Sequence, residues 1–292
     1  MKPRAPRTVG IVVHPGKPGA RARLSELLEV LHNHRITVLL EREAAALVGT
    51  RRPGRSLPAI GKAADMVIVL GGDGTILRAA RELEGLATPI LGVNLGNLGF
   101  LTSIHGNRLH GPVQDILHGH YEISPRHTLQ TALVRKGKRR VTHQALNDVV
   151  VSRAALSRIV RLRLFVDSEL LTEYVCDGMI FATATGSTAY SLSAGGPILV
   201  PTSRALIITP ICPHALSNRP VVAGGNSVIR CQVADAAAAL LLTVDGQVQL
   251  RMEVGDEVEV RRSPRTVQLV MPREHSYFEV LREKLKWSGA NV

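Results

Sequence analysis

A strand, a glycine-rich turn and a helix follow one another near residue 70. Met66 to Leu70 is an apolar run, Gly71-Gly72-Asp73-Gly74-Thr75 is the turn, and an Ala-rich helical pattern continues to Arg81. Because the apolar run does not alternate with polar residues, we expect both faces of the strand to be buried, as in a parallel sheet. The turn then lies at the carboxyl edge of that sheet, where open α/β folds bind their ligands.

The residues of this turn suit a phosphate. Gly71, Gly72 and Gly74 let the backbone approach a ligand and adopt positive φ, and the N-terminus of the helix directs N–H groups toward an anion. Asp73 would repel a phosphate, so we expect its carboxylate either to take a proton from a hydroxyl or to hold a cation that holds the phosphates. The alternative is a plain turn in which Asp73 caps the helix, since short glycine motifs are weak evidence.

Strands and helices alternate over the first third of the chain. Thr8 to Val13, Ile36 to Leu40 and Ile90 to Val93 are further strand-like runs, and Arg21 to His32 has its leucines at helical spacing. This alternation predicts a doubly wound α/β domain, which we assign to residues 1–120.

The segment after the strand at Ile90 reads NLGNLGFLT, from Asn94 to Thr102. It follows another carboxyl edge of the predicted sheet, so we expect it to face Asp73. Its Phe100 either packs on a flat ring of a ligand or belongs to the core.

From about Tyr121 the pattern changes to short runs typical of β-strands, separated by turns. The alternation from Arg161 to Asp167 predicts a sheet with one wet, basic face. Asn147 and Asp148 interrupt one of the runs. Because both are poor strand formers, they mark either a bulge or a pair of polar groups aimed at a ligand. Helical periodicity returns at Ser276 to Lys286.

A dense set of hydroxyl groups and small residues occupies Thr183 to Pro197, which reads TATGSTAYSLSAGGP. Such a segment packs little apolar mass but offers many hydrogen-bond donors and close backbone approach, as a nucleotide site requires. A plain loop of this length would be unusual inside an apolar chain.

The charge balance points to anionic partners. The chain has 36 Lys and Arg against 24 Asp and Glu, a formal charge of +12, which suits nucleotides, polyphosphate or nucleic acid. Aromatic residues make up only 3% of the chain, and the basic residues are scattered. We therefore expect no nucleic-acid partner.

The cysteines and the apolar runs indicate the compartment. Cys176, Cys212 and Cys231 are isolated and lack metal-ligand spacing, so we expect neither disulfides nor a structural zinc, and a reducing cytoplasm fits. No apolar run approaches the roughly 18 residues of a membrane span, so we expect no membrane partner.

Four motifs together resemble those of the bacterial, ATP- or polyphosphate-dependent NAD kinase family. They are Gly71 to Thr75, Asn94 to Thr102, Asn147-Asp148 and Thr185 to Pro197, in this order and spacing. The resemblance covers nearly the whole chain. It implies an α/β domain, a β-sandwich-like NAD-binding domain over residues 121–265, and a C-terminal segment, 266–292, that returns to the first domain. It also implies a homodimer or homotetramer.

The activity that the resemblance implies is phosphoryl transfer from ATP or inorganic polyphosphate to the 2′-hydroxyl of the adenosine ribose of NAD. A divalent cation, Mg²⁺, is expected with the phosphates, carried mostly by them and by water, and we predict no protein metal cage. Asp73 matches the family's proton acceptor, and Gly71, Gly72 and Gly74 are the expected phosphate-binding residues. The expected NAD contacts are Asp73, Gly74, Arg78, Asn147, Asp148, Arg158, Asp177, Thr188, Ala189, Tyr190, Ser191, Leu192, Ser193 and Gln247.

The chain departs from the family at two positions. Many relatives have Pro where this chain has Ala184, and a basic or polar residue where it has Val175, so we expect no side-chain contact from Val175. Three other functions fit the sequence less well. A lipid kinase fits the glycine turn but not the hydroxyl-rich segment, Asp73 argues against a non-catalytic dinucleotide-binding regulator, and the scarcity of aromatics argues against a nucleic-acid binder.

Overall fold

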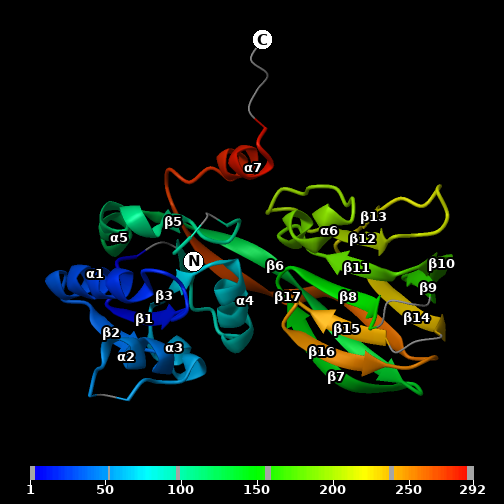
Figure 1. The fold of residues 1–292 in the computed structure, drawn as a ribbon, viewed down its shortest axis with the longest axis horizontal. Helices are drawn as coiled ribbons and strands as arrows, with labels where there is room; N and C mark the ends of the chain where they lie inside the picture. The colour runs from blue at the N-terminus through cyan, green and yellow to red at the C-terminus, as the bar shows by residue number, and fades with distance from the viewer. Residues whose placement is uncertain (1–3, 52, 97–98, 155–158, 237–239, 288–292) are drawn as a thin grey trace, which may run out of the picture. The chain divides into compact units, whose positions relative to one another are not determined.

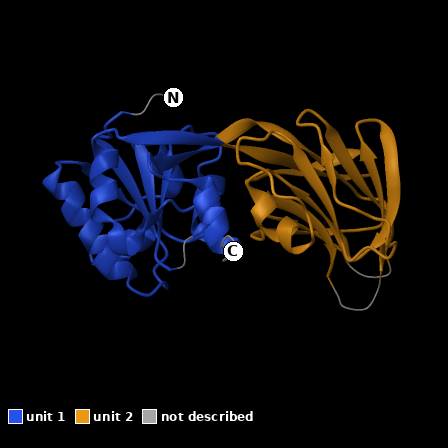
Figure 2. Ribbon diagram, turned by 90° about the horizontal axis from the view of Figure 1, so that it is seen from above, with its two compact units in different colours: residues 1–125, 267–292 blue, residues 126–266 orange. Residues whose placement is uncertain are grey.

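The computed structural model describes residues 4–51, 53–96, 99–154, 159–236 and 240–287. The chain forms two compact units, shown in different colours in Figure 2. Unit 1 contains residues 1–125 and 267–292, and unit 2 contains residues 126–266.

Unit 1 is built on a parallel sheet (Figure 1). Its central strands lie in the order β4, β3, β1, β2, and every residue of β3 and β4 is buried. Short β5 and the last part of β17 pair with β4. The bounds are β1 Thr8–Val13, β2 Thr37–Leu40, β3 Met66–Gly71, β4 Ile90–Asn94, β5 Ile104–His105 and β17 Glu257–Pro272. The non-alternating run at Met66 is therefore a strand buried on both faces, as its sequence predicts.

Helices cover both faces of this sheet. On one face, Leu24 and Leu27 of α1 and Val113 of α5 pack with Val9 and the other buried residues of that side of β1. On the opposite face, Ile60 of α3 packs so closely on β1 that a Cβ atom on Gly10 would overlap it. The helices are α1 Ala20–Asn33, α2 Arg42–Val48, α3 Leu57–Ala63, α4 Asp73–Glu82, α5 His110–Leu117, α7 Tyr277–Leu285 and the 3-10 turn η1 Gly106–Arg108. The predicted doubly wound arrangement is confirmed.

Unit 2 is antiparallel and consists of two stacked sheets with a hairpin. One sheet has the strand order β10, β9, β14, β17, and the other has the order β13, β12, β11, β8, β15, β16. Long β6 pairs with β17 and with β7. The bounds are β6 Tyr121–Arg135, β7 Lys138–Ala145, β8 Asp148–Arg153, β9 Val160–Val166, β10 Glu169–Cys176, β11 Gly178–Ala182, β12 Leu206–Ile211, β13 Val221–Ala223, β14 Val228–Ala236, β15 Leu240–Val244 and β16 Val248–Met252. Between β11 and β12 lie η2 Gly186–Thr188 and α6 Tyr190–Ser193.

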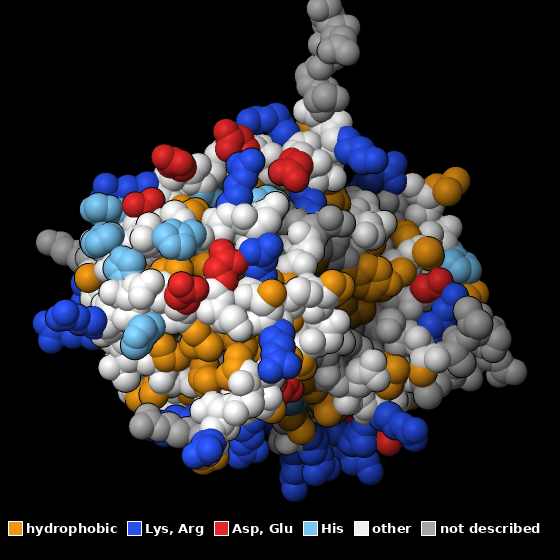
Figure 3. Space-filling view, turned by 60° about the vertical axis from the view of Figure 1, so that its left-hand side comes forward, with side chains coloured by type: hydrophobic (Ala, Val, Ile, Leu, Met, Phe, Trp, Pro, Cys, Tyr) orange, Lys and Arg blue, Asp and Glu red, His pale blue; other side chains and the backbone are white. Residues whose placement is uncertain are grey.

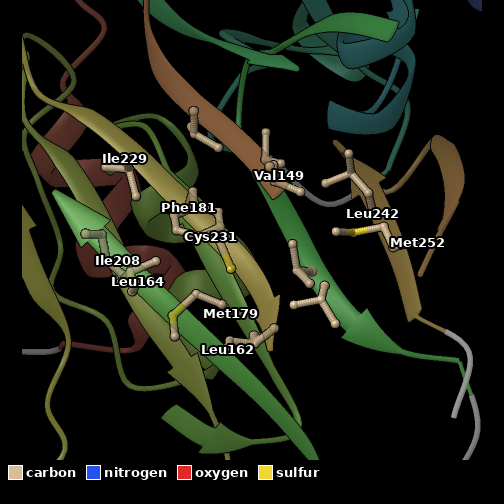
Figure 4. Packing of buried hydrophobic residues seen from close by; sticks show 14 of the residues in the cluster. Val149, Leu162, Leu164, Met179, Phe181, Ile208, Ile229, Cys231, Leu242 and Met252 are labelled. Carbon is tan, nitrogen blue, oxygen red and sulfur yellow. The ribbon is translucent and has the colours of Figure 1, made fainter. Parts of the chain in front are cut away.

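The core of unit 2 lies between its two sheets. Leu162 and Cys231 come from one sheet, Phe181 and Leu242 from the other, and all four belong to one buried cluster (Figure 4). Along β9 the buried residues alternate with exposed Arg161 and Arg163, so the predicted basic outer face is confirmed. Side chains that alternate inward and outward on two facing sheets make a β-sandwich, which is the fold that the resemblance implies.

Several elements differ from the sequence-based prediction. Helix α5 and strands β14 and β16 were not among the predicted elements, although Val248 to Met252 alternates apolar and polar residues, and the chain from Glu257 to Pro272 forms the single long strand β17. No helix in the described part of the chain has the length and apolarity needed to cross a membrane. Figure 3 shows Lys and Arg side chains at several places on one face, with acidic and histidine side chains among them.

Candidate functional site

The glycine turn joins β3 to α4 in unit 1. Strand β3 ends at Gly71, and α4 begins at Asp73. None of Gly71, Gly72 and Gly74 has positive φ, so the expectation that they adopt it is wrong. Their smallness serves another purpose: a Cβ atom on Gly71 would overlap the hydroxyl of Thr75, whereas Cβ atoms on Gly72 and Gly74 would meet nothing within 4 Å. The space beside the last two glycines lets a ligand approach the backbone.

Asp73 contacts the loop that follows β4. Its Oδ2 accepts the N–H of Phe100 at 2.9 Å, and its Oδ1 accepts the N–H of Leu101 at 3.1 Å. A Cβ atom on Gly99 would overlap the same carboxylate. The residue that caps α4 is Gly72, without a side-chain cap bond, so the reading of Asp73 as a helix cap is wrong. Two backbone N–H groups orient the carboxylate, while each oxygen keeps further acceptor capacity.

The loop after β4 is held by its own polar groups. Buried Asn94 donates from Nδ2 to the hydroxyl of Thr102 at 3.2 Å, and the same hydroxyl accepts the N–H of Gly99 at 2.9 Å. Phe100 is half-buried, and its ring centroid lies 6.5 Å from that of Tyr277 on α7. Asn97 and Leu98 of the motif lie outside the described residues.

Arg78, one turn along α4, is bound to carboxylates. Its guanidinium contacts both oxygens of Glu41, at 2.6 and 3.0 Å, and lies 3.7 Å from Glu43 and 3.5 Å from Glu82. The hydrogen bonding of Arg78 to the Glu41 carboxylate is the main cause that raises the pKa of Arg78. In this structure the side chain therefore stabilises the start of α2 against α4, and contact with NAD stays a prediction.

In unit 2 the Asn147-Asp148 motif lies where the chain leaves one sheet for the other. Strand β7 ends at Ala145 and β8 begins at Asp148, so the pair forms a junction, and its interpretation as a strand bulge is wrong. Thr183 fixes the junction from one side, because its N–H donates to the carbonyl of Asn147 at 2.9 Å and its hydroxyl donates to that of Leu146 at 2.6 Å.

A residue that we did not predict fixes the other side. The carboxylate of Asp245 accepts the backbone N–H groups of Leu146 at 2.8 Å, Asn147 at 2.8 Å and Asp148 at 3.1 Å. Asp245 begins the turn between β15 and β16. The sequence signal for that turn is Asp245-Gly246 between two apolar runs, a common pair in tight hairpins, but nothing in it indicates the partner.

Asp148 is a buried acid. Its side chain is almost fully enclosed, and burial raises its pKa to about 7, with a further contribution from the negative charge of Asp245. A carboxyl group with such a pKa changes charge near neutral pH, which is common at functional sites.

The hydroxyl-rich segment divides into buried and accessible residues. Ser187 donates to the carbonyl of Ala184 at 2.6 Å, and Ser191 shares a hydrogen bond of 2.9 Å with Thr209. Both serines are fully buried, so these hydroxyls hold the segment together. A Cβ atom on Gly186 would overlap the backbone of Asn147, which brings the segment directly against the junction.

The other predicted contacts of unit 2 are at different degrees of exposure. Tyr190 and Ser193 are exposed, and Thr188, Ala189 and Leu192 are half-buried. Asp177 forms an ion pair of 2.9 Å with Arg153, and Gln247 is exposed in the turn after Asp245. Arg158 lies outside the described residues. In unit 1, Asp73 of the glycine turn therefore contacts the loop that contains Phe100. In unit 2, the Asn147-Asp148 junction contacts the hydroxyl-rich segment.

Among the described residues, no group of three or more His, Cys, Asp or Glu side chains is arranged to hold a metal ion. A cation at the glycine turn would take Asp73 as its carboxylate ligand. Phosphate and water oxygens would supply its other ligands, which suits Mg²⁺.

Comparisons with known proteins cover both units. The model of the ATP-NAD kinase N-terminal domain matches residues 9–121, and that of the ATP-NAD kinase C-terminal domain matches residues 146–271. An NAD kinase of Syntrophotalea carbinolica is 40% identical over 281 residues, 96% of this chain and 99% of that protein. An NAD kinase of Geobacter metallireducens is 43% identical over 270 residues, 92% of this chain and 95% of that protein.

Solved structures agree in fold. Yeast NADH kinase complexed with NADH matches with a TM-score of 0.89 and 29% identity, over 99% of this chain and 90% of that one. An NAD kinase from Archaeoglobus fulgidus in complex with ATP matches with a TM-score of 0.76 and 24% identity, over 97% of this chain and 100% of that one. With family models on both units and relatives at about 40% identity along almost its whole length, the chain belongs to the ATP-NAD kinase family.

Proposed function

We propose that the protein transfers a phosphoryl group from ATP or inorganic polyphosphate to the 2′-hydroxyl of the adenosine ribose of NAD, forming NADP. The observation that carries this proposal is the carboxylate of Asp73. It follows the carboxyl end of a buried parallel strand, is oriented by two backbone N–H groups, and lies beside glycines that leave room for a ligand. The family of the chain and its relatives named NAD kinase support NAD as the substrate.

Asp73 acts as the proton acceptor. The 2′-oxygen attacks the terminal phosphorus of the donor, the bond from that phosphorus to the leaving phosphate oxygen breaks, and the hydroxyl proton passes to a carboxylate oxygen of Asp73. The N–H groups of Phe100 and Leu101 keep the carboxylate in one orientation, so little reorganisation is needed when the proton arrives.

The glycine turn contacts the phosphates. Gly72 and Gly74 let phosphate oxygens approach the backbone at the start of α4, whose dipole favours negative charge there. A divalent cation such as Mg²⁺, when carried by the phosphates, would supply charge neutralisation of the leaving group. Asp73 is the carboxylate of this turn that can also reach such an ion.

The residues of unit 2 hold the dinucleotide. Asn147 and Asp148 offer an amide and a carboxyl group to a sugar or an amide of the dinucleotide. The accessible residues from Thr188 to Ser193 belong to the hydroxyl-rich segment beside this junction. Ser191 is fully buried, and its hydroxyl is bonded to Thr209, so its part in this set is to hold the segment in place. Asp177 and Gln247 belong to this proposed contact set, together with Arg78 and Arg158. The yeast relative in complex with NADH supports a dinucleotide ligand for this fold.

The proposal includes a homodimer or homotetramer and a cytoplasmic location. Three free cysteines agree with a reducing compartment. The phosphoryl donor is decided by experiment: purified protein is incubated with NAD, Mg²⁺ and either ATP or polyphosphate, and NADP is measured, with parallel reactions that contain NADH. Formation of NADP identifies the donor. If NADP appears with neither donor, the proposed activity is wrong.

A further inference from the structure

Asp245 makes more backbone hydrogen bonds than its turn requires. A comparable turn in the same unit begins with Asp167, between β9 and β10. Both aspartates have left-handed backbone, with φ of 49° for Asp245 and 57° for Asp167. The backbone N–H of Asp245 donates to the carbonyl of Asp148 at 2.9 Å, and that of Asp167 donates to the carbonyl of Val228 at 2.7 Å. In each turn the aspartate carboxylate also accepts the backbone N–H of that same partner residue.

The two turns differ in what else the carboxylate holds. In the described contacts, Asp167 accepts the single N–H of Val228 at 2.9 Å. Asp245 accepts the N–H of Asp148 and, in addition, those of Leu146 and Asn147. The first bond suffices to close such a turn. The other two fix the backbone of the Asn147-Asp148 junction, which lies about a hundred residues earlier in the chain.

We propose that Asp245 is a positioning residue for the dinucleotide: its carboxylate fixes the backbone from Leu146 to Asp148, so that the side chains of Asn147 and Asp148 are held ready for NAD. This inference rests on the proposed binding role of those two residues. Backbone that is fixed before the ligand arrives does not have to be ordered on binding, so the affinity is higher.

The charge of Asp245 has a second effect on the same site. Burial is the main cause that raises the pKa of Asp148 to about 7, and the negative charge of Asp245 raises it further. The fraction of Asp148 that is protonated near neutral pH therefore depends on Asp245. NAD binding should change around that pH, because a protonated carboxyl group can donate a hydrogen bond and an ionised one only accepts.

Two variants separate geometry from charge. Asp245→Asn is nearly isosteric and tolerates left-handed backbone, but its amide has no charge and turns a donor toward one of the three N–H groups. We expect the Kd and KM for NAD to rise by about tenfold with a smaller change in kcat, and the pH midpoint of NAD binding to move to lower pH. Asp245→Glu keeps the charge but displaces the oxygens, so NAD affinity should fall while the pH midpoint stays.

Asp167→Asn is the matched control. It removes the charge from the equivalent left-handed aspartate of the other turn, outside the proposed binding residues. Melting temperature, calorimetric NAD affinity between pH 5.5 and 8.5 (roughly the range around the midpoint) and steady-state kinetics are measured for all three variants. We expect Asp167→Asn to lower the melting temperature without changing Kd, KM or the pH midpoint.

The outcomes distinguish this inference from the proposed function. Asp245 has no positioning role if Asp245→Asn and Asp245→Glu lose stability like the control and keep wild-type affinity and pH midpoint, while Asn147→Ala weakens binding. If Asn147→Ala also binds NAD normally, the binding role of the junction is wrong, and this inference with it. Absence of NADP formation by the wild type contradicts only the activity, because NAD binding by calorimetry does not depend on turnover.

Discussion

A Cβ atom on Gly99 would overlap Oδ1 of Asp73, so this glycine lets the loop after β4 lie directly against the carboxylate. The next two residues, Phe100 and Leu101, then donate their N–H groups to its two oxygens. Gly99→Ala should move either the loop or the carboxylate by a few tenths of an ångström or more. We expect kcat for NADP formation to fall by about tenfold or more, since catalytic geometry tolerates little displacement.

The control for this variant is Gly111→Ala in α5, where a Cβ atom would meet nothing within 4 Å. Alanine is the better helix former there, so kcat should not change and the melting temperature should rise slightly. Wild-type kcat in Gly99→Ala would contradict the view that the loop orients Asp73.

Asp73→Asn should retain NAD binding and lose turnover. The amide can still accept one of the two N–H groups, but it cannot accept the proton of the 2′-hydroxyl. We expect kcat to fall by about two to four orders of magnitude, the usual range for loss of a general base. Single-turnover kinetics and NAD calorimetry on the same preparation measure both quantities. Partial rescue by added Mg²⁺ would instead assign Asp73 to a cation.

Asn147→Ala and Asp148→Ala should each raise the NAD requirement. Loss of a hydrogen-bonding partner in an enclosed site costs about 1–3 kcal/mol, which corresponds to roughly tenfold or more in Kd. For Asn147→Ala the melting temperature should change little, because Asp245 and Thr183 hold the backbone of this residue and not its side chain. A clear loss of stability with unaltered NAD affinity would mean that Asn147 only shapes the junction.

The stability of the free protein should depend on pH through Asp148. Its pKa of about 7 in the folded state lies above the ordinary 3.8, so the folded state binds the proton more tightly than the unfolded state. The free energy of unfolding therefore falls as pH rises between these two values and levels off above 7. Asp148→Asn removes the charge, and relative to wild type it should gain up to about 4 kcal/mol between pH 4 and pH 8.

Urea denaturation of both proteins at several pH values, without NAD, measures that gain. Burial raises the pKa of Asp256, but the hydrogen bonds that it accepts from Arg135 and from the backbone N–H of Glu253 outweigh burial and hold the pKa below its ordinary value. The contribution of Asp256 to stability therefore depends on pH in the opposite direction. The comparison must therefore be the difference between the variant and wild type. A difference that does not vary with pH would refute the raised pKa of Asp148.

Arg78→Met should reveal whether this arginine binds NAD or only stabilises the fold. The variant leaves Glu41 buried without its main cationic partner, so we expect a loss of about 1.5–3 kcal/mol in the free energy of unfolding. Arg23→Met, which breaks a pair with Glu26 on the surface of α1, should cost less than about 1 kcal/mol. An increase in the Kd for NAD in Arg78→Met, beyond the loss of stability, would add ligand contact to its role.

Sequence patterns within a single strand predicted which faces of that strand are buried. The unbroken apolar run at Met66 indicated a strand buried on both faces, and the alternation around Arg161 indicated a strand with one wet face. The short motifs located Asp73 and the Asn147-Asp148 junction because glycines and polar residues are conspicuous at the ends of apolar runs.

Contacts between distant segments could not be predicted in this way. The hydrogen bonds from the N–H of Leu146 to Asp245 and from Arg78 to Glu41 join residues far apart in the chain, and their formation depends on the topology of the sheets. The conformation of Gly71 was predicted wrongly for a related reason. Its lack of a side chain suits the closeness of Thr75 on the following helix, a packing constraint that a glycine pattern does not distinguish from a need for positive φ.

The division of unit 1 into two separate stretches of chain has a consequence for biosynthesis. Unit 2 is a continuous segment, whereas unit 1 includes residues 267–292. This last stretch contains helix α7 and the end of β17, where Leu269 pairs with Ile90. During translation the first 125 residues therefore emerge without the segment that completes their sheet. They must wait until all of unit 2 has been synthesised, so a ribosome that stops anywhere before β17 releases a chain whose β4 edge is incomplete and open to aggregation.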